Sequence, residues 1–249
     1  MLYKLYLNLT RTIYILCGVT LVIILGASIW LSIIPQQNEP KLAAYWLWGK
    51  VPLTAAPHAT AIYLYQGDFT TEQGHFRFTH RGNAPHPVTN NNIHLVFRIE
   101  KMLPPAQMVS SVANSVIQRW ELRGVHIQGI QIDYDSPTNK LLYYSNYLHD
   151  IRQQLPRQYA LSVTALVDWV NVKDHHALIQ MANVTDRIIF QLYNGNTAIP
   201  HLENYVQQIK NLSIPYSIGL LPKQAQSTAI LSELQQAKNY HGIVYFIGS

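Results

Sequence analysis

The chain has 249 residues and a net charge of +5, and only 12% of its residues are charged. Soluble domains usually carry about one quarter charged residues. Because 48% of the residues are apolar, including 16 Tyr and 5 Trp, the chain can bury a core, which excludes general disorder. The single cysteine excludes a disulfide scaffold. The positive charge is diffuse, so no nucleic-acid partner is predicted.

The N-terminal part predicts a membrane anchor. Residues 12–34 carry no charge and are long enough to cross about 30 Å of hydrocarbon as a helix. Lys4 and Arg11 precede them, which predicts a cytoplasmic segment 1–11, a single pass through membrane lipid at 12–34, a linker at 35–43 and a domain at 44–249 across the membrane. A cleaved signal peptide is the alternative, but its apolar region is usually only about 7–15 residues long.

Eight apolar runs with strand character follow. Several are almost continuously apolar, as in strands that are buried on both faces. The predicted strands are 45–49, 61–65, 93–99, 127–133, 159–166, 187–193, 216–221 and 242–248.

Helical patterns separate the later strands, at about 105–122, 137–155, 175–183, 201–210 and 224–239. In the second of these, Ser136 is the candidate N-cap and Pro137 the first helical residue. The alternation predicts a (β/α)₈ TIM-type barrel, with an irregular first quarter because 50–60 is too short for a crossover helix and 70–92 is typical of a hairpin and loop. A different mixed α/β sheet is the alternative.

The segment QGIQIDYDSP, residues 128–137, holds the closest grouping of candidate functional side chains. Side chains alternate along a strand, so Gln131, Asp133 and Asp135 share the face that would point to the barrel axis. Asp133 and Asp135 would lie about 6.6 Å apart along the backbone, within reach of one glycosidic bond. The structural alternative is that Asp135 caps the next helix and that Asp133 only makes a hydrogen bond in the barrel mouth.

This segment resembles the fourth-strand signature DGxDxDxE of family 18 glycoside hydrolases, the chitinase family. Gly129 matches the glycine, Asp133 the last aspartate and Asp135 the glutamate, while Gln128 and Gln131 replace two aspartates. FQLYN, residues 190–194, resembles the sixth-strand motif of the same family, and HGIVYFIGS, residues 241–249, resembles its closing strand.

The wider similarity is to a bacterial family, domain-of-unknown-function family 3142. It rests on the runs LVFRI (95–99), IQIDYDSPTNKL (130–141), LSVTALVDW (161–169) and FQLYN. The resemblance implies a chitinase-like barrel in a membrane-anchored or exported bacterial protein. With the anchor predicted above, the expected location is the bacterial inner membrane, with the C-terminal domain periplasmic or extracellular. The family's activity is not implied.

Further candidates lie at predicted strand ends, where aromatic rings and amides suit sugar binding. Trp48 and Gln66 follow the first two strands, and Arg98 lies in the third as a partner of Asp133 or a substrate clamp. The alternative for Trp48 is a core residue, which is the commoner fate of an aromatic residue in a first strand. The remaining substrate-binding candidates are Gln131, Asp168, Trp169, Gln191 and Tyr193.

No zinc, nucleotide-binding or serine-hydrolase motif occurs, so neither a metal site nor a cofactor is predicted. The predicted function is that of a glycoside-hydrolase-like barrel with Asp135 as general acid and Asp133 as its second carboxylate. Because Asp135 is one methylene shorter than glutamate and Gln131 carries no charge, the alternative is a barrel that binds or scaffolds glycans without cleaving them. The sequence leaves the oligomeric state open.

Overall fold

The computed structural model of the protein describes residues 43–88, 92–172, 175–195, 197, 199–222 and 228–248. Contacts divide the chain into Met1–Lys41 and Leu42–Ser249. The predicted cytoplasmic segment and membrane anchor, with nearly all of the linker, lie outside the described residues. Within the described ranges, no helix is both long and apolar enough to cross a membrane.

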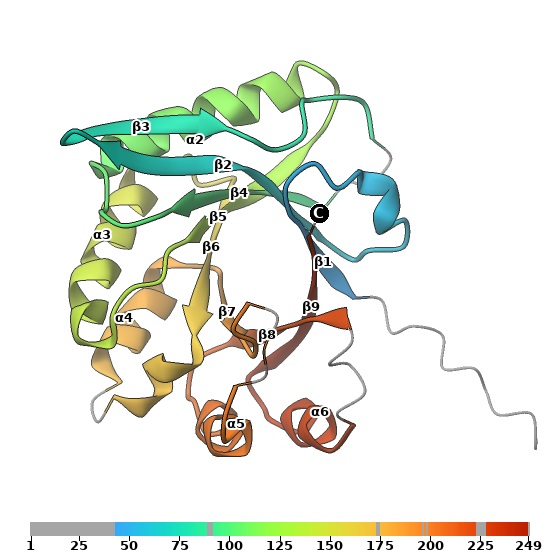
Figure 1. The fold of residues 1–249 in the computed structure, drawn as a ribbon, viewed down its shortest axis with the longest axis vertical. Helices are drawn as coiled ribbons and strands as arrows, with labels where there is room; N and C mark the ends of the chain where they lie inside the picture. Colours follow the sequence, from blue (N-terminus) through green and yellow to red (C-terminus); the bar gives the residue numbers. More distant parts are fainter. Residues whose placement is uncertain are drawn as a thin grey trace, which may run out of the picture. The chain divides into compact units, whose positions relative to one another are not determined.

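Eight parallel strands close into a ring, which confirms the predicted barrel (Figure 1). Each strand pairs with its neighbours along the chain, and β1 closes the ring by pairing with both β2 and β9. The strands of the ring are β1 (Ala44–Leu47), β2 (Ile62–Glu72), β4 (Ile93–Ile99), β5 (Ile127–Asp133), β6 (Ala160–Leu166), β7 (Arg187–Gln191), β8 (Tyr216–Leu220) and β9 (Tyr240–Ile247).

Five described helices lie outside this ring in Figure 1. They are α2 (Ala106–Glu121), α3 (Leu141–Gln154), α4 (His176–Val184), α5 (Leu202–Lys210) and α6 (Thr228–Gln235). Helix α2 shows why the sequence pattern identified them, since its buried residues Val109, Ala113, Val116 and Trp120 recur every three or four positions.

The first quarter of the barrel is irregular, as predicted. Only a 3₁₀ turn, η1 (Leu53–Ala55), connects β1 to β2. Between β2 and β4 the chain forms β3 (His75–His80), which pairs antiparallel with the second half of β2, from Gly67 onward. This β2–β3 hairpin extends beyond the part of β2 that pairs with β1.

The predicted cap of the helix after β5 is wrong. A 3₁₀ turn, η2 (Thr138–Lys140), follows Pro137, and α3 begins only at Leu141. Neither element has a side-chain cap hydrogen bond. The Ser136 hydroxyl instead donates to the carbonyl of Pro137, so Ser136 shapes the turn without capping the helix. A further 3₁₀ helix, η3 (Val167–Asn171), follows β6.

The outer and inner sides of the ring belong to different hydrophobic clusters. Ile130 and Ile132 of β5 belong to the large core that packs against the helices. A smaller buried cluster fills the barrel interior, and it comprises Ala44, Trp46, Ala61, Tyr63, Val96, Ile189 and Val244. The alternation predicted for β5 therefore holds.

Trp46 fills the middle of the interior and is almost fully buried. Its indole Nε1 donates to Oε1 of Gln131 at 2.5 Å. Room for the ring comes from Gly219 on β8, because a Cβ built there would lie 2.3 Å from a Trp46 ring carbon. A glycine at this position is thus a packing requirement of the barrel.

Gly219→Ala should lower the free energy of unfolding by about 1–3 kcal/mol, because the added methyl group overpacks the interior against Trp46. Denaturant unfolding of the full chain measures this change. Ser217→Ala, two residues earlier on the same strand, is the matched control. The Ser217 hydroxyl has no hydrogen-bond partner among the described residues, so its removal should be nearly neutral. Equal effects of the two substitutions would contradict the packing role of Gly219.

Candidate active site

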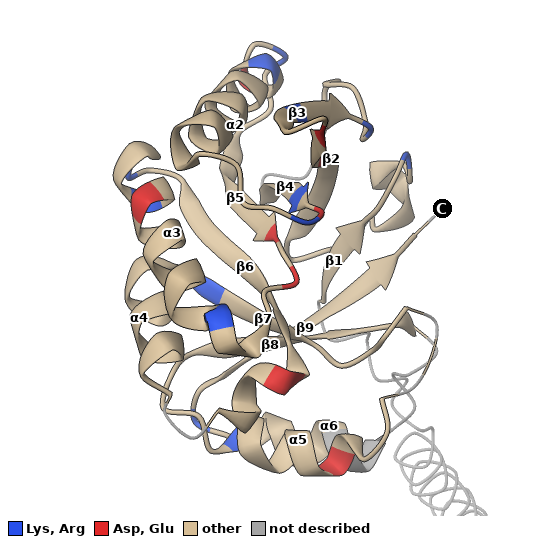
Figure 2. Cartoon of the chain, turned by 60° about the vertical axis from the view of Figure 1, so that its left-hand side comes forward, with Lys and Arg blue, Asp and Glu red and all other residues tan. Residues whose placement is uncertain are grey.

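Three charged side chains form a row at the C-terminal ends of neighbouring ring strands. In the strand register Asp68 of β2 pairs with Arg98 of β4, and Arg98 pairs with Asp133 of β5. Figure 2 shows the acidic end of β5 beside a basic position of β4. Parallel strands place register partners on the same face, so this row brings two carboxylates and one guanidinium to one rim of the barrel.

Asp133 is the buried member of the row and is 9% exposed. Its Oδ1 accepts a hydrogen bond of 2.6 Å from the Thr164 hydroxyl, and its Oδ2 lies 4.0 Å from Nε of Arg98. Burial is the main cause that raises the pKa of Asp133 to about 6, and the charges of Asp135 and Asp68 add to it. The Thr164 hydrogen bond and Arg98 oppose the rise.

Asp135 lies two residues beyond Asp133 and is exposed to solvent. It makes no hydrogen bond or ion pair with the residues that the structure describes, and it does not cap the turn that follows. Its charge acts on the pKa values of Asp133, Tyr193 and Tyr144. Asp135 is therefore an accessible carboxylate beside a buried one.

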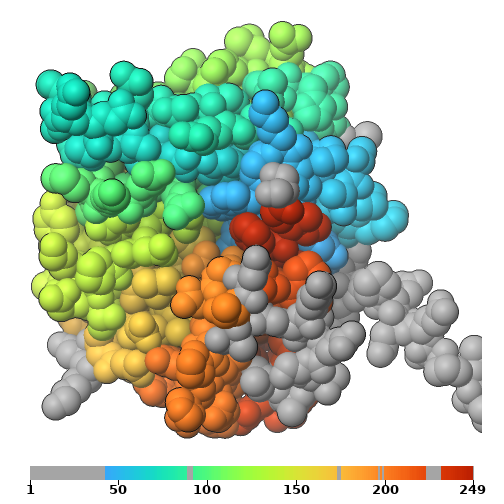
Figure 3. Space-filling view, viewed as in Figure 1, coloured from blue at the N-terminus to red at the C-terminus, as the bar shows by residue number. Residues whose placement is uncertain are grey.

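Aromatic rings pack at the same mouth. Trp48 stacks on Tyr65 with ring centroids 4.4 Å apart, and Phe246 lies 5.8 Å from Tyr193 and 5.7 Å from Trp48. Tyr193 is half-buried, and burial followed by the charge of Asp133 raises its pKa above the ordinary value. The pKa shift places the Tyr193 hydroxyl within the electrostatic reach of the two aspartates. Around the centre of the face in Figure 3, the blue, green, orange and red parts of the chain meet.

Two of the three candidate glutamines, Gln191 and Gln131, lie at different depths. Gln191 is half-buried and hydrogen-bonds to Tyr193, so it belongs to the mouth. Gln131 is fully buried beneath the mouth, where its oxygen accepts from Trp46. Its Nε2 has no partner among the described residues. Gln131 therefore lies in the interior layer below the charged row.

Three predicted candidates are held elsewhere by their contacts. Asp168 is exposed on η3 and accepts a hydrogen bond from Tyr205 of α5. The Trp169 indole is buried in the helix-side core and donates to the carbonyl of Ser136. The side chain of Gln66 accepts from Trp120 of α2, also on the helix side. None of these contacts links the three residues to the two aspartates.

Four residues at this mouth were not predicted, namely Tyr65, Asp68, Arg81 and Thr164. Asp68 is buried, pairs with Nε of Arg81 at 2.9 Å and is hydrogen-bonded to Tyr65. A register shift between Tyr65 and Gly67 turns Asp68 toward the interior. The signal in the sequence was the GDF that ends the second apolar run, since a glycine inside a strand often marks a bulge.

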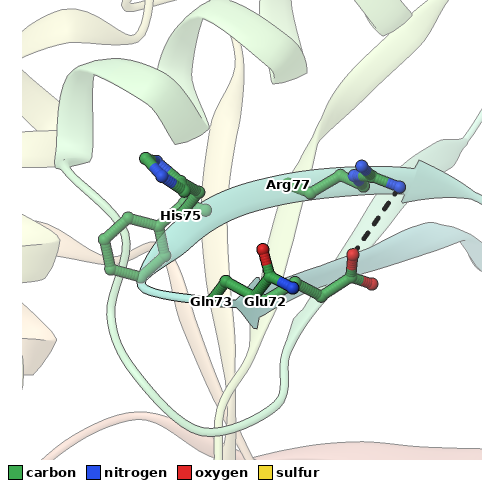
Figure 4. Close-up of a pocket in the computed structure, with 5 residues that line it drawn as sticks. Glu72, Gln73, His75 and Arg77 are labelled. Atoms are coloured by element: carbon green, nitrogen blue, oxygen red, sulfur yellow. Dashed lines mark ion pairs between the residues drawn. The ribbon is translucent and has the colours of Figure 1, made fainter.

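The described residues contain no group of three or more His, Cys, Asp or Glu side chains that could hold a metal ion. Two cavities lined by described residues lie away from the charged row. One, at the opposite mouth of the barrel, has a volume of about 390 Å³. The other, of about 830 Å³, is an open hollow at the tip of the β2–β3 hairpin (Figure 4). There Arg77 and Glu72, both largely exposed, form an ion pair of 3.7 Å.

The segment from 91 to 198, which holds the two aspartates and Tyr193, matches a known family. Its description is "Domain of unknown function (DUF3142)". The family resemblance predicted from the sequence is confirmed. No curated protein matches the chain.

Solved structures are similar to this chain in fold. The xylanase and alpha-amylase inhibitor protein XAIP-II of Scadoxus multiflorus is 13% identical, with a TM-score of 0.53 over 82% of this chain and 92% of that chain. The chitinase domain of the spore coat protein CotE from Clostridium difficile is 13% identical, with a TM-score of 0.47 over 76% of this chain and 68% of that chain. The spore cortex-lytic enzyme SleL of Bacillus cereus is 13% identical, with a TM-score of 0.41 over 72% of this chain and 50% of that chain. At such identity the first of these shows the barrel fold alone.

Asp133→Asn should stabilise the protein at alkaline pH. The pKa of Asp133 in the folded chain, about 6, exceeds the value of about 3.9 for an unperturbed aspartate. The folded chain therefore holds this proton more tightly, and the free energy of unfolding falls as the pH rises from about 4 to about 6. Asn does not ionise, so the variant does not lose this stability. At pH 8 its free energy of unfolding should exceed that of the parent by up to about 3 kcal/mol, and at pH 4 the two values should agree.

Urea unfolding at pH 4 and pH 8 measures the difference. Asp135→Asn is the matched control, because the same change at an exposed carboxylate should alter stability by no more than about 0.5 kcal/mol at either pH. A parent that is more stable than Asp133→Asn at pH 8 would contradict the unfavourable burial of Asp133.

Proposed function

We propose that this protein is a membrane-anchored, glycoside-hydrolase-like barrel that acts on a glycan of the bacterial cell envelope or its surroundings. The observation that carries the proposal is the pair at the end of β5, where the buried Asp133, with a pKa raised to about 6, adjoins the accessible Asp135. Titratable groups whose environments differ in this way are typical of acid–base sites.

The two carboxyl groups take different roles because they differ in exposure. Asp135 is reachable from solvent and stands where the chitinase-like signature has its glutamate, so we assign it as the donor to the glycosidic oxygen. Asp133, held by Thr164 and near Arg98, supplies fixed negative charge below the sugar ring. Such a charge stabilises the oxocarbenium-like transition state of glycoside hydrolysis.

The surrounding side chains suit a sugar ligand. Trp48 and Tyr193 are half-buried aromatic residues of the same mouth, and sugar C–H faces stack on such rings. Arg98 has a side chain that is 46% exposed, so its guanidinium can bind a ligand oxygen while it stays near Asp133. Gln191 completes this set through its hydrogen bond to Tyr193.

The apolar segment 12–34 supports the location. A span of this length after Lys4 and Arg11 anchors the chain in the inner membrane, with the barrel in the periplasm or outside the cell. Envelope glycans are then the substrates within reach.

A non-catalytic glycan-binding or scaffolding barrel is the second candidate. The observation that favours it is the fixed side chain of Gln131, which is fully buried and bonded to Trp46, so it cannot contact a sugar. The related fold of XAIP-II carries the name of an inhibitor protein. The fold alone therefore does not decide between cleavage and binding.

Hydrolysis of a panel of fluorescently labelled envelope glycans by the full chain tests the proposal. Asp135→Asn should lower kcat/KM at least about 100-fold, because general acid catalysis contributes about that much. Asp133→Asn should lower kcat and abolish a limb of the pH profile near pH 6, where Asp133 ionises in the parent. Asp150→Asn on the exposed face of α3 is the control and should leave kcat/KM unchanged.

The outcomes separate the two candidates. Turnover that survives in both Asp133→Asn and Asp135→Asn would refute the catalytic assignment. Saturable glycan binding without turnover, weakened by Tyr193→Ala, would establish the non-catalytic candidate in its place.

A further inference from the structure

The N-terminal mouth of the barrel holds a separate polar cavity of about 390 Å³. Every strand-borne residue of its lining lies at or near the start of a ring strand, whereas the two aspartates lie at strand ends. Trp46, Val96 and Ile189 of the interior cluster lie between these levels of the barrel. The cavity is therefore distinct from the candidate active site. Its titratable and amide-bearing lining residues include Tyr63, Asn92, His94, Asp186 and Arg187.

Arg187 brings positive charge to this cavity, and no described carboxylate forms an ion pair with it. It is half-buried, and among the described residues no acidic group lies within ion-pair distance of it. The neighbouring Asp186 is engaged elsewhere, since its Oδ2 accepts from the Leu161 amide at 2.8 Å and lies 3.7 Å from Arg152. Arg187 instead hydrogen-bonds to Tyr63. A half-buried guanidinium without a counter-charge favours an anion beside it.

His94 offers a hydrogen-bond acceptor whose identity follows from the network. Asn92 Nδ2 donates to the Thr60 carbonyl, so Asn92 Oδ1 faces Nε2 of His94, 3.2 Å away. Nε2 must then carry the proton, because an amide oxygen only accepts. Burial, then the charge of Arg187, lower the pKa of His94 to about 4 against the opposing charge of Asp186, so the ring is neutral at pH 7.

The remaining nitrogen, Nδ1, is consequently an unprotonated acceptor. It is buried and has no partner among the described residues. His94 stacks on Tyr63 with ring centroids 4.9 Å apart, which fixes the plane of the imidazole. The cavity thus combines a cation with a buried acceptor and calls for a ligand that carries both negative charge and an O–H donor.

We propose that this cavity binds a small oxyanion that retains a protonated oxygen, namely hydrogen phosphate or a phosphate monoester. Its charged oxygens pair with Arg187, and its P–OH group donates to Nδ1 of His94. The cavity lies near the lower end of the volumes that hold small molecules, which leaves room for a phosphate with a small organic group. This site is independent of the glycan function.

Isothermal titration of the full chain at pH 6 with inorganic phosphate, sulfate and acetate tests the proposal. Phosphate should bind saturably and at least about 10-fold more tightly than sulfate, which carries the charge but no O–H at this pH. Arg187→Gln should abolish binding, while Arg123→Gln, the same change at an exposed arginine, should not alter it. Thermal unfolding without ligand checks that each variant is folded, and Arg187→Lys, which keeps the charge, replaces Arg187→Gln if that variant is unfolded.

His94→Phe keeps the stacked ring but removes the acceptor, so phosphate and sulfate should then bind with similar affinity. Absence of phosphate binding to the parent, or equal binding by parent and Arg187→Gln, would overturn the site. If Arg187→Lys has to be used, a phosphate affinity equal to that of the parent would overturn the pairing with the guanidinium. Equal affinity of the parent for phosphate and sulfate would overturn the role of His94. Tighter binding of acetate than of phosphate would overturn the assignment to phosphate.

Discussion

The hydrogen bond between Trp46 and Gln131 in the middle of the closed ring is the contact on which the rest of the interior depends. Eight parallel strands enclose a space that side chains must fill, and here one indole occupies most of it. The bulk of Trp46 requires the absent side chain of Gly219, and its N–H requires a buried acceptor. Gln131 supplies that acceptor at no cost in charge, so the centre of the barrel is packed and neutral.

A packed centre separates the two mouths, and they differ in their titratable groups. The C-terminal mouth gathers Asp68 and Asp133 around Arg98, with Asp135 beyond them. The N-terminal mouth contains Arg187 and the neutral His94. The groups that shift the pKa of Asp133 all belong to its own mouth: burial there raises it most, and Thr164, Asp135, Arg98 and Asp68 modify the shift.

The sequence predicted all eight ring strands, because buried parallel strands leave apolar runs that local patterning detects. It also predicted the inward face of β5, since strict alternation fixes every side chain once one of them is placed. It did not predict Asp68, because a register shift in β2 breaks that alternation. Thr164 was missed for another reason, as a threonine in a strand signals nothing until its partner Asp133 is known.

Asp168 and Trp169 show another limit of prediction from sequence. Trp169 and Asp168 follow β6 and so satisfied the rule that functional residues lie at strand ends. In the structure η3 directs them to Ser136 and to Tyr205 of α5. A rule about position along a strand says nothing of the turn that follows, and a 3₁₀ turn reorients every side chain it contains.

The replacement of a family aspartate by Gln131 also has a physical rationale. A carboxylate at this position would be fully buried, with the Trp46 indole as its donor and Asp133 two residues along the same face. Two like charges at such depth would push both pKa values upward, and one of them would hold a proton at neutral pH. Glutamine removes that conflict and leaves the ionisation of the site to Asp133 and Asp135. Two carboxyl groups, Asp133 and Asp135, therefore remain at the end of β5, with a neutral amide below them.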